Sequence, residues 1–150
     1  MKDILNYIKV NKHIATAGQP RKKQFKKIAK KDFDVVINLA ILDHPKALKD
    51  EDKIVSKLVM SYIHIPISWE KPEIDKLELF LYILSTLQKQ KKKVFIHCIK
   101  NYRVSVFIYH YKKIVLKQKD TRLIAPKDFK PNKVWKEIID ICEIDNDYTY

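Results

Sequence analysis

The segment Val94-Phe95-Ile96-His97-Cys98-Ile99-Lys100-Asn101-Tyr102-Arg103-Val104-Ser105 decides how this sequence is interpreted. It begins as a short apolar run with strand character that ends at a His-Cys pair, and an amphipathic helix is predicted to begin at Arg103 after a polar loop. A cysteine at such a turn lies beside a helix N-terminus, whose free N–H groups and dipole favour anions. The same field stabilises a thiolate. The segment therefore predicts a nucleophile and an anion-binding loop made from one stretch of chain.

Strands and helices are predicted to alternate on both sides of this segment. Short apolar runs predict strands, and longer runs with helical spacing predict helices, the last of them capped by Asn132. Residues 7–14 are expected to be extended and to be followed by a turn at 17–20. The predicted strands are 34–39, 62–65 and 94–97, and the predicted helices are 21–31, 48–60, 74–88, 103–116 and one from 132 that carries Cys142.

This alternation predicts one α/β domain over residues 1–150, with a central, mainly parallel sheet of about four to five strands flanked by helices. In such sheets, ligands gather beyond the carboxyl ends of the strands. Three predicted strands end near Ala40, Pro66 and Cys98. We expect these three segments to converge on one crevice that contains the cysteine. We also expect the single glycine of the chain, Gly18, to be needed in its turn.

The composition favours anionic partners but does not select one. The formal net charge is +13, which attracts phosphorylated substrates, nucleic acid or an acidic membrane lipid. A lysine-rich surface without a specific partner explains the same charge. The sequence contains no aromatic platform of the kind that binds single-stranded nucleic acid, so nucleic acid ranks low as a partner.

Further features of the sequence bear on the cellular compartment of the protein and on its need for a cofactor. No apolar stretch is long enough to span a membrane, the N-terminus lacks the pattern of a signal peptide, and Cys98 and Cys142 are too few for a disulfide framework. We therefore expect a cytoplasmic protein. The histidines show no metal-ligand spacing with one another or with Cys142, so we expect neither a metal nor another cofactor. The oligomeric state is not indicated.

Residues 97–105 resemble the signature of the cysteine-dependent phosphatases of the protein tyrosine and dual-specificity superfamily, which is His-Cys, five residues, Arg, then Ser or Thr. Here only four residues separate Cys98 from Arg103, whereas Ser105 keeps the family's position seven residues after the cysteine. The shorter spacing is similar to that of a bacterial subgroup of phosphatase-like domains and to the active loop of many rhodanese-type sulfurtransferases. Residues 16–20 and the strand at 35–39 also resemble the opening of bacterial dual-specificity-like phosphatases.

The resemblance implies a role for several side chains. Cys98 would attack phosphorus and form a cysteinyl-phosphate, and Arg103 would hold two phosphate oxygens in its planar fork. Ser105 would donate to the departing thiolate, or it is only a serine of the first helical turn. Val104 stands where the family usually has arginine, and its place on an apolar stripe predicts that it points into the core. Backbone N–H groups would complete the anion site, from Ile99, Lys100, Asn101, Tyr102 and Val104.

A phosphatase of this kind also needs a general acid that protonates the departing oxygen. The family usually places an aspartate on a loop that follows a strand ending in Ile-Pro. The matching stretch here is 64–70, which contains no aspartate, and Glu70 is its nearest carboxylate. Asp43 and Asp75 are the alternative acids. Trp69, beside Glu70, is expected to line the substrate face or simply to pack.

These observations favour a hydrolase that acts on a phosphorylated protein or on a small anionic phosphomonoester. Two alternatives stay open. One is a rhodanese-like sulfurtransferase or persulfide carrier, in which Cys98 would carry sulfur. The other is a catalytically impaired module that binds phosphate or phosphoinositide through the same loop.

Overall fold

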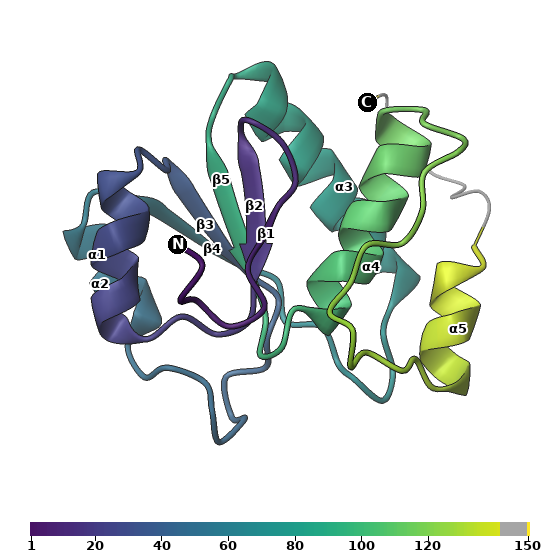
Figure 1. Ribbon diagram of the computed structural model, residues 1–150, viewed down its shortest axis with the longest axis horizontal. Helices are drawn as coiled ribbons and strands as arrows, with labels where there is room; N and C mark the ends of the chain where they lie inside the picture. Colours follow the sequence, from purple (N-terminus) through teal and green to yellow (C-terminus); the bar gives the residue numbers. More distant parts are fainter. Residues whose placement is uncertain (142–149) are drawn as a thin grey trace.

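A computed structural model describes residues 1–141 and residue 150 of the chain (Figure 1). The sequence-based placement of Cys142 lies outside the described residues. The strands are β1 (Ile8–Lys9), β2 (Ile14–Ala17), β3 (Val35–Asn38), β4 (Ser61–His64) and β5 (Val94–His97). The helices are α1 (Lys22–Lys30), α2 (Glu51–Lys57), α3 (Ile74–Lys89), α4 (Tyr102–His110), the π-helix η1 (Tyr111–Val115) and α5 (Lys133–Ile139).

The strands form one five-stranded sheet in the order β1-β2-β5-β3-β4, in which only β1 runs antiparallel to its neighbour. The predicted α/β domain with a mainly parallel sheet is thus confirmed. The predicted extended segment 7–14 contains β1 and the first residue of β2, whereas Ala17, which was expected in the turn 17–20, is the last residue of β2, an inner strand between β1 and β5. Four buried residues with no alternation of polar and apolar side chains give only a weak strand signal.

Helices cover both faces of the sheet, as Figure 1 shows, with α1 and α2 on one face and α3, α4 and α5 on the other. Successive strand residues point to opposite faces, and this alternation divides the core into two. Val36 and Phe95 pack with Phe25 of α1 in the first core. Ile37 and Ile96, one residue further along the same strands, pack in the second core with α3, α4 and α5.

Two details of the helices differ from expectation. Ile74 had the spacing of a buried position, but it is 46% exposed because it is the first residue of α3 and lies beyond the edge of the core. The predicted helix 103–116 begins one residue earlier, at Tyr102, and its last turn is the π-helix η1. Asn132 caps α5 as predicted, since its side-chain oxygen accepts from the Trp135 N–H at 3.0 Å.

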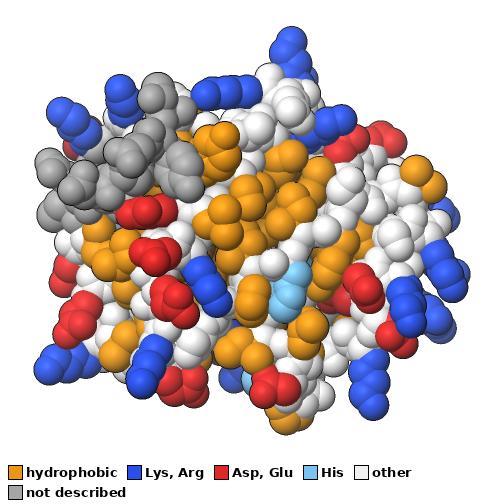
Figure 2. Space-filling model, turned by 180° about the vertical axis from the view of Figure 1, so that it is seen from behind, with side chains coloured by type: hydrophobic (Ala, Val, Ile, Leu, Met, Phe, Trp, Pro, Cys, Tyr) orange, Lys and Arg blue, Asp and Glu red, His pale blue; other side chains and the backbone are white. Residues whose placement is uncertain are grey.

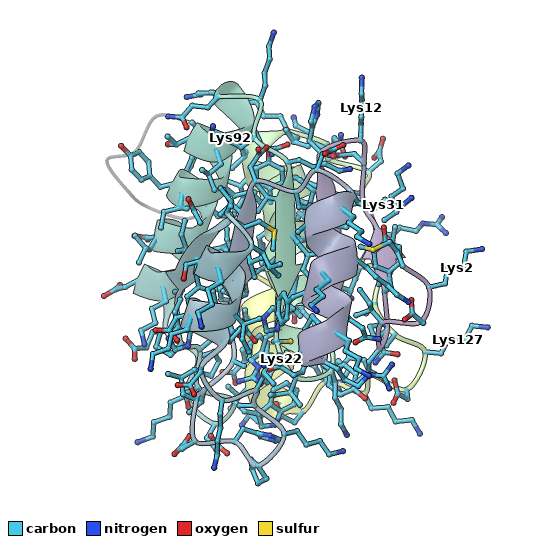
Figure 3. The ribbon with its side chains drawn as sticks, turned by 90° about the vertical axis from the view of Figure 1, so that its left-hand side faces the viewer. Lys2, Lys12, Lys22, Lys31, Lys92 and Lys127 are labelled. Atoms are coloured by element: carbon cyan, nitrogen blue, oxygen red, sulfur yellow. The ribbon has the colours of Figure 1, made fainter. Side chains whose placement is uncertain are left out.

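The surface carries scattered positive charge (Figure 3) and, on one face, a broad apolar area (Figure 2). The lysines labelled in Figure 3, from Lys2 and Lys12 to Lys92 and Lys127, extend into solvent from different parts of the molecule. Figure 2, in which β4 and α3 lie toward the viewer, shows apolar side chains gathered in the middle of that face. None of the helices in residues 1–141 combines the length and the apolar character that crossing a bilayer requires.

Candidate active site

The carboxyl ends of β3, β4 and β5 meet at one edge of the sheet, as the sequence predicted. The parallel pairing places Asn38 beside both His64 and His97. The segments that follow these strands border a cleft of about 600 Å³. Its walls contain most of the predicted site residues together with one histidine that was not predicted: Ile41, Asp43, His44, Trp69, Glu70, Cys98, Ile99, Lys100, Tyr102 and Arg103.

Cys98 lines this cleft, directly after β5 and four residues before the start of α4. Its side chain is almost fully buried, and its backbone N–H donates to the Ala17 carbonyl at 3.3 Å. The amides of the next six residues, 99–104, have no hydrogen-bond acceptor among the described residues. The last three belong to the first turn of α4, where helix geometry leaves the N–H groups free and directed out of the helix end. The loop therefore presents a row of unused donors and the positive end of a helix dipole beside a thiol.

Asn101 shapes the loop because its backbone takes the left-handed conformation, with φ = 66°. Asparagine tolerates this conformation better than most residues. Its side-chain Nδ2 donates to the Asn6 carbonyl at 2.8 Å and to Thr16 Oγ1 at 3.0 Å. Asn6 in turn donates through its Nδ2 to the Lys100 carbonyl at 2.9 Å. The N-terminal segment thus braces the loop, a contact between distant residues that sequence reasoning missed.

Ser105 is placed on the side of α4 that supports this brace. Its Oγ donates to the Asn101 carbonyl at 2.6 Å, and it does not line the cleft that contains Cys98. In this structure its hydroxyl hydrogen is therefore committed to the loop backbone. Val104 is fully buried in the core, as predicted.

Gly18 meets the loop from the other side. A Cβ atom on Gly18 would lie 2.5 Å from the Ile99 carbonyl oxygen, which is closer than real Cβ contacts allow. The Gly18 N–H donates to Leu5, and the Gln19 N–H donates to the same Ile99 carbonyl at 2.9 Å. The expectation that the only glycine of the chain is needed at this position is therefore supported by a close backbone approach.

Arg103 occupies the second position of α4 and is 7% exposed, with its side chain on the cleft wall. Its Nη1 donates to the Ile67 carbonyl at 2.8 Å. Ile67 belongs to the segment that leads to Trp69 and Glu70, so the guanidinium is anchored between the cysteine loop and that segment. A guanidinium has five N–H donors, so this bond leaves donors for an anion in the cleft.

Of the three candidate acids, Glu70 and Asp43 line the cleft, whereas Asp75 does not. Ser68 Oγ donates to Glu70 Oε2 at 3.4 Å. His44 lies next to Asp43, and its Nδ1 accepts from the Lys46 N–H at 3.0 Å, which leaves Nε2 as the N–H donor of a neutral ring. In residues 1–141 no group of three or more His, Cys, Asp or Glu side chains is arranged to hold a metal ion.

Aromatic side chains build one wall of the cleft. Trp69 stacks on Trp135 with ring centroids 5.1 Å apart, and Trp135 Nε1 donates to the Trp69 carbonyl at 2.8 Å. Tyr102, from the first turn of α4, stacks on Phe129 at 4.7 Å. Burial and the neighbouring Asp128 raise the pKa of Tyr102, so its phenol keeps its proton. Trp69 thus lines the cleft and packs, which covers both of the expectations for it.

A buried histidine–glutamate pair lies behind the cysteine. His97 Nε2 is 2.7 Å from Glu51 Oε2, and His97 Nδ1 is 3.1 Å from the Cys98 carbonyl oxygen. Glu51 Oε1 also accepts from Gln19 Nε2 at 2.7 Å. Burial and the charge of Glu51 raise the pKa of the nearby Tyr62 phenol. Both ring nitrogens of His97 therefore face oxygen atoms, one of Glu51 and one of the loop backbone.

Sequence reasoning did not single out Glu51, Gln19 or Asn6. Glu51 is the first residue of α2 and is 3% exposed, although a glutamate at a helix start is usually solvated. A sequence alone gives no signal for this burial. The sequence predicts a turn at 17–20, and only the structure shows that Gln19 connects this segment to Glu51.

No protein-family model matches the sequence, and no curated protein matches it. Among solved structures, the chain is similar to a candidate phosphatase (DUF442) from Shewanella putrefaciens CN-32, with a TM-score of 0.80 and 27% identity over 92% of this chain and 91% of that chain. It is also similar to Tk-PTP in its active form, with a TM-score of 0.64 and 20% identity over 77% of this chain and 76% of that one.

A third similar structure is TpbA from P. aeruginosa in complex with pTyr, with a TM-score of 0.58 and 14% identity over 75% of this chain and 65% of that chain. Three observations indicate the same fold: the segment with the His-Cys pair, the mainly parallel sheet and the likeness to these solved structures. The chain has the fold of the cysteine-based protein tyrosine and dual-specificity phosphatases.

Proposed function

We propose that this protein is a cysteine-dependent phosphatase that hydrolyses phosphomonoesters through a cysteinyl-phosphate intermediate. The observation that carries the proposal is the row of six amides, 99–104, without acceptors in the described structure, next to the thiol of Cys98 in a cleft. A row of free N–H groups at a helix N-terminus binds a phosphate group, and it also stabilises the negative charge that builds up during transfer.

The proposed reaction has two steps. In the first, the thiolate of Cys98 attacks phosphorus, the P–O bond to the leaving group breaks, and a carboxylic acid on the cleft wall gives its proton to the departing oxygen. In the second, the same carboxylate takes a proton from water, whose oxygen attacks phosphorus, and the thiolate leaves with the S–P electron pair. Arg103 would hold two non-bridging oxygens in both steps. Glu70 is our first choice for the acid and Asp43 the second, because both line the cleft.

The aromatic wall favours a substrate with a flat, apolar group beside the phosphate. Trp69 and Tyr102 line the cleft on one side of Cys98, where an aryl ring would pack against them. A phosphotyrosine side chain fits this chemistry, and TpbA, whose fold is similar, was solved with pTyr. We therefore propose a phosphorylated protein or a small aryl phosphomonoester as substrate. A cleft of about 600 Å³ is also wide enough for phosphoserine or for the headgroup of an acidic lipid, which makes dual specificity part of the proposal.

The short spacing between Cys98 and Arg103 favours a second candidate, a sulfurtransferase in which Cys98 carries sulfur. The likeness to phosphatase structures supports the first candidate over the second. A module that binds phosphate without turnover is the third candidate, since the same amides would serve it.

The experiment compares the wild-type protein with Cys98→Ser, Cys142→Ser and Arg103→Lys. The substrates are p-nitrophenyl phosphate and phosphotyrosine peptides, with vanadate as inhibitor. We expect Cys98→Ser to abolish turnover and to keep anion binding, because serine is hardly ionised at neutral pH. Cys142→Ser is the matched control and should retain activity. Arg103→Lys should lose most activity, since lysine keeps the charge but not the two-pronged geometry.

Three outcomes decide among the candidates. Vanadate-sensitive turnover that requires Cys98 supports the phosphatase. Formation of thiocyanate from thiosulfate and cyanide, without phosphatase turnover, would replace it with the sulfurtransferase. Saturable phosphate binding without either reaction would leave the binding module. Near-normal phosphatase activity in Cys98→Ser would refute the cysteinyl-phosphate mechanism.

A further inference from the structure

A second cavity lies behind the cysteine loop and shares no residue with the cleft. Its volume is about 50 Å³, and it is bounded by β1, β2, α4, η1 and the segment after η1. The residues of α4 that line it begin at Ser105, whereas Tyr102 and Arg103 line the cleft. The cleft therefore lies at the N-terminal end of α4, and the second cavity runs along the same helix from Ser105 to Lys112 of η1.

Three cationic side chains from three separate segments line this small space. Lys9 comes from β1, Lys112 from η1 and Arg122 from the chain between η1 and α5. None of the three has an ion pair or a hydrogen-bond acceptor for its side chain among residues 1–141. Lys9 and Arg122 are exposed and Lys112 is half-buried, so water screens part of the repulsion between their charges, and an anion bound between them would remove more of it. A cavity that three cationic residues line and no carboxylate lines favours an anionic ligand.

The general preference of this chain for lysine does not explain the cluster of Lys9, Lys112 and Arg122. Of the 31 basic residues, 28 are lysine and three are arginine, namely Arg21, Arg103 and Arg122. Arg103 lines the proposed phosphate cleft, and Arg122 lines the second cavity. A guanidinium binds an oxyanion with two parallel N–H donors, which an ammonium cannot do. In a chain that uses lysine almost everywhere, an arginine at such a cavity points to oxyanion recognition.

The inner end of the cavity provides a hydroxyl. Thr16, which is 2% exposed, accepts through Oγ1 from Asn101 Nδ2 at 3.0 Å, and its own hydroxyl hydrogen has no acceptor among the described residues. Ser105 lies beside it, with its hydroxyl donated to the Asn101 carbonyl. A buried donor and three cations together make a complementary environment for a small tetrahedral oxyanion. Both hydroxyl groups contact Asn101, the residue that shapes the cysteine loop.

We propose that this second cavity is a binding site for a phosphate group, separate from the cleft that contains Cys98. Arg122 and Lys112 supply most of the attraction, and Thr16 supplies a directed hydrogen bond. The site does not depend on the proposed phosphatase activity. A phosphate group that binds only the folded protein also stabilises the folded state. At this site it would stabilise the cysteine loop in particular, because Thr16 contacts Asn101, which shapes that loop.

The test is a titration of ¹⁵N-labelled full-length protein with sodium phosphate at constant ionic strength, followed by backbone amide shifts. Four proteins are compared: Cys98→Ser, and the same background with Arg103→Gln, with Arg122→Gln plus Lys112→Gln, or with Lys119→Gln. We expect Arg103→Gln to weaken the shifts of the cleft amides and to leave saturable shifts around Thr16 and Lys112. The Arg122→Gln plus Lys112→Gln protein should keep the shifts of the cleft amides and weaken those around Thr16 and Lys112. Phosphate should bind the second site at least about tenfold more weakly.

Lys119→Gln is the matched control, since Lys119 is an exposed lysine near Lys112 and Arg122 that does not line the cavity. It should change neither set of shifts. Saturable shifts around Thr16 that persist unchanged without Arg122 and Lys112 would overturn the proposal. The same holds if these shifts disappear together with those of the cleft in Arg103→Gln, because a single site would then explain both. None of these outcomes depends on turnover, so they are independent of the proposed reaction.

A second ligand identifies the source of the phosphate group. Glycerol 2-phosphate carries the same group on a larger molecule. The Cys98→Ser protein should leave it intact, because serine is hardly ionised at neutral pH and does not replace the cysteine nucleophile. Binding of inorganic phosphate alone supports a site for the free ion. Comparable binding of glycerol 2-phosphate supports a site for the phosphate group of a larger ligand, whose remaining atoms extend out of the cavity.

Discussion

Glu51 Oε2 lies 2.7 Å from His97 Nε2, and both side chains are almost fully buried. The opposite side of the imidazole faces the Cys98 carbonyl. A carboxylate on α2 therefore holds a ring on β5, and the ring holds the backbone at the start of the cysteine loop. Breaking a buried pair from one side leaves an uncompensated polar group, which costs more than the pair itself contributes.

Removing the carboxylate is expected to destabilise the protein strongly. Glu51→Ala leaves His97 buried without its partner and should lower the free energy of unfolding by about 3–5 kcal/mol. Glu51→Gln retains a hydrogen-bonding group and should lower it less. Urea unfolding measures both, with Asp52→Ala as control because Asp52 is the exposed neighbour of Glu51. An equal, small effect for Glu51→Ala and Asp52→Ala would show that the pair does not hold the loop.

Substitution of the single glycine is expected to displace the loop. In Gly18→Ala the added Cβ would lie 2.5 Å from the Ile99 carbonyl oxygen, a backbone atom that cannot rotate away. We expect a loss of about 1–3 kcal/mol in the free energy of unfolding and weaker binding of vanadate or phosphate in the cleft. Urea unfolding and an anion titration measure the two effects. Unchanged anion binding would mean that the loop tolerates the shift of Ile99.

The identity of the general acid can be decided with three matched variants. Glu70→Gln should slow the hydrolysis of alkyl phosphates by about 10²–10⁴ and affect activated aryl phosphates much less, because only a poor leaving group needs the proton. Asp43→Asn tests Asp43 as the alternative general acid. Asp75→Asn is the control, since Asp75 does not line the cleft. A leaving-group dependence in Asp43→Asn instead of Glu70→Gln would transfer the role to Asp43.

His110 predicts a dependence of stability on pH. It is fully buried, its Nε2 donates to the Ile138 carbonyl at 2.7 Å, and its Nδ1 has no partner among the described residues. Burial, aided by Lys113, lowers the pKa of His110 below the usual value of 6.5. The unfolded chain therefore takes up a proton on this residue at a higher pH than the folded protein does. As pH falls below about 6.5, the free energy of unfolding should decrease by up to about 1.4 kcal/mol per pH unit.

Urea unfolding of the wild type and of His110→Gln at pH 7.5 and 5.5 tests this prediction. Glutamine does not titrate, so the variant should lose less stability between the two pH values than the wild type. His13→Gln is the control, because His13 is only half-buried. A pH dependence that is the same in wild type and His110→Gln would assign the acid sensitivity to other groups.

The local sequence was enough to predict the central part of the site. The apolar run 94–97, the His-Cys pair and the amphipathic helix that follows predicted a strand, a loop and a helix N-terminus. These features depend on side-chain spacing and on helix-end geometry over about a dozen residues, so the sequence encodes them directly. The convergence of three strand ends could also be predicted, because parallel strands share one carboxyl edge. By the same logic, the apolar stripe of α4 correctly placed Val104 in the core.

Tertiary structure alone decided which side chains support that loop. Glu51 meets His97 across 46 positions of sequence, and Asn6 meets Asn101 across 95. Such pairs depend on strand order and on the burial of each helix end, which local propensity does not encode. Ser105 illustrates the limit: its position suggested a partner for the thiolate, but its hydroxyl donates to Asn101 and it lines the second cavity. The sequence determined where a nucleophile and an anion-binding helix end would occur. Only the packing of distant segments determined what holds them and which way each side chain faces, because a contact depends on the positions of both partners.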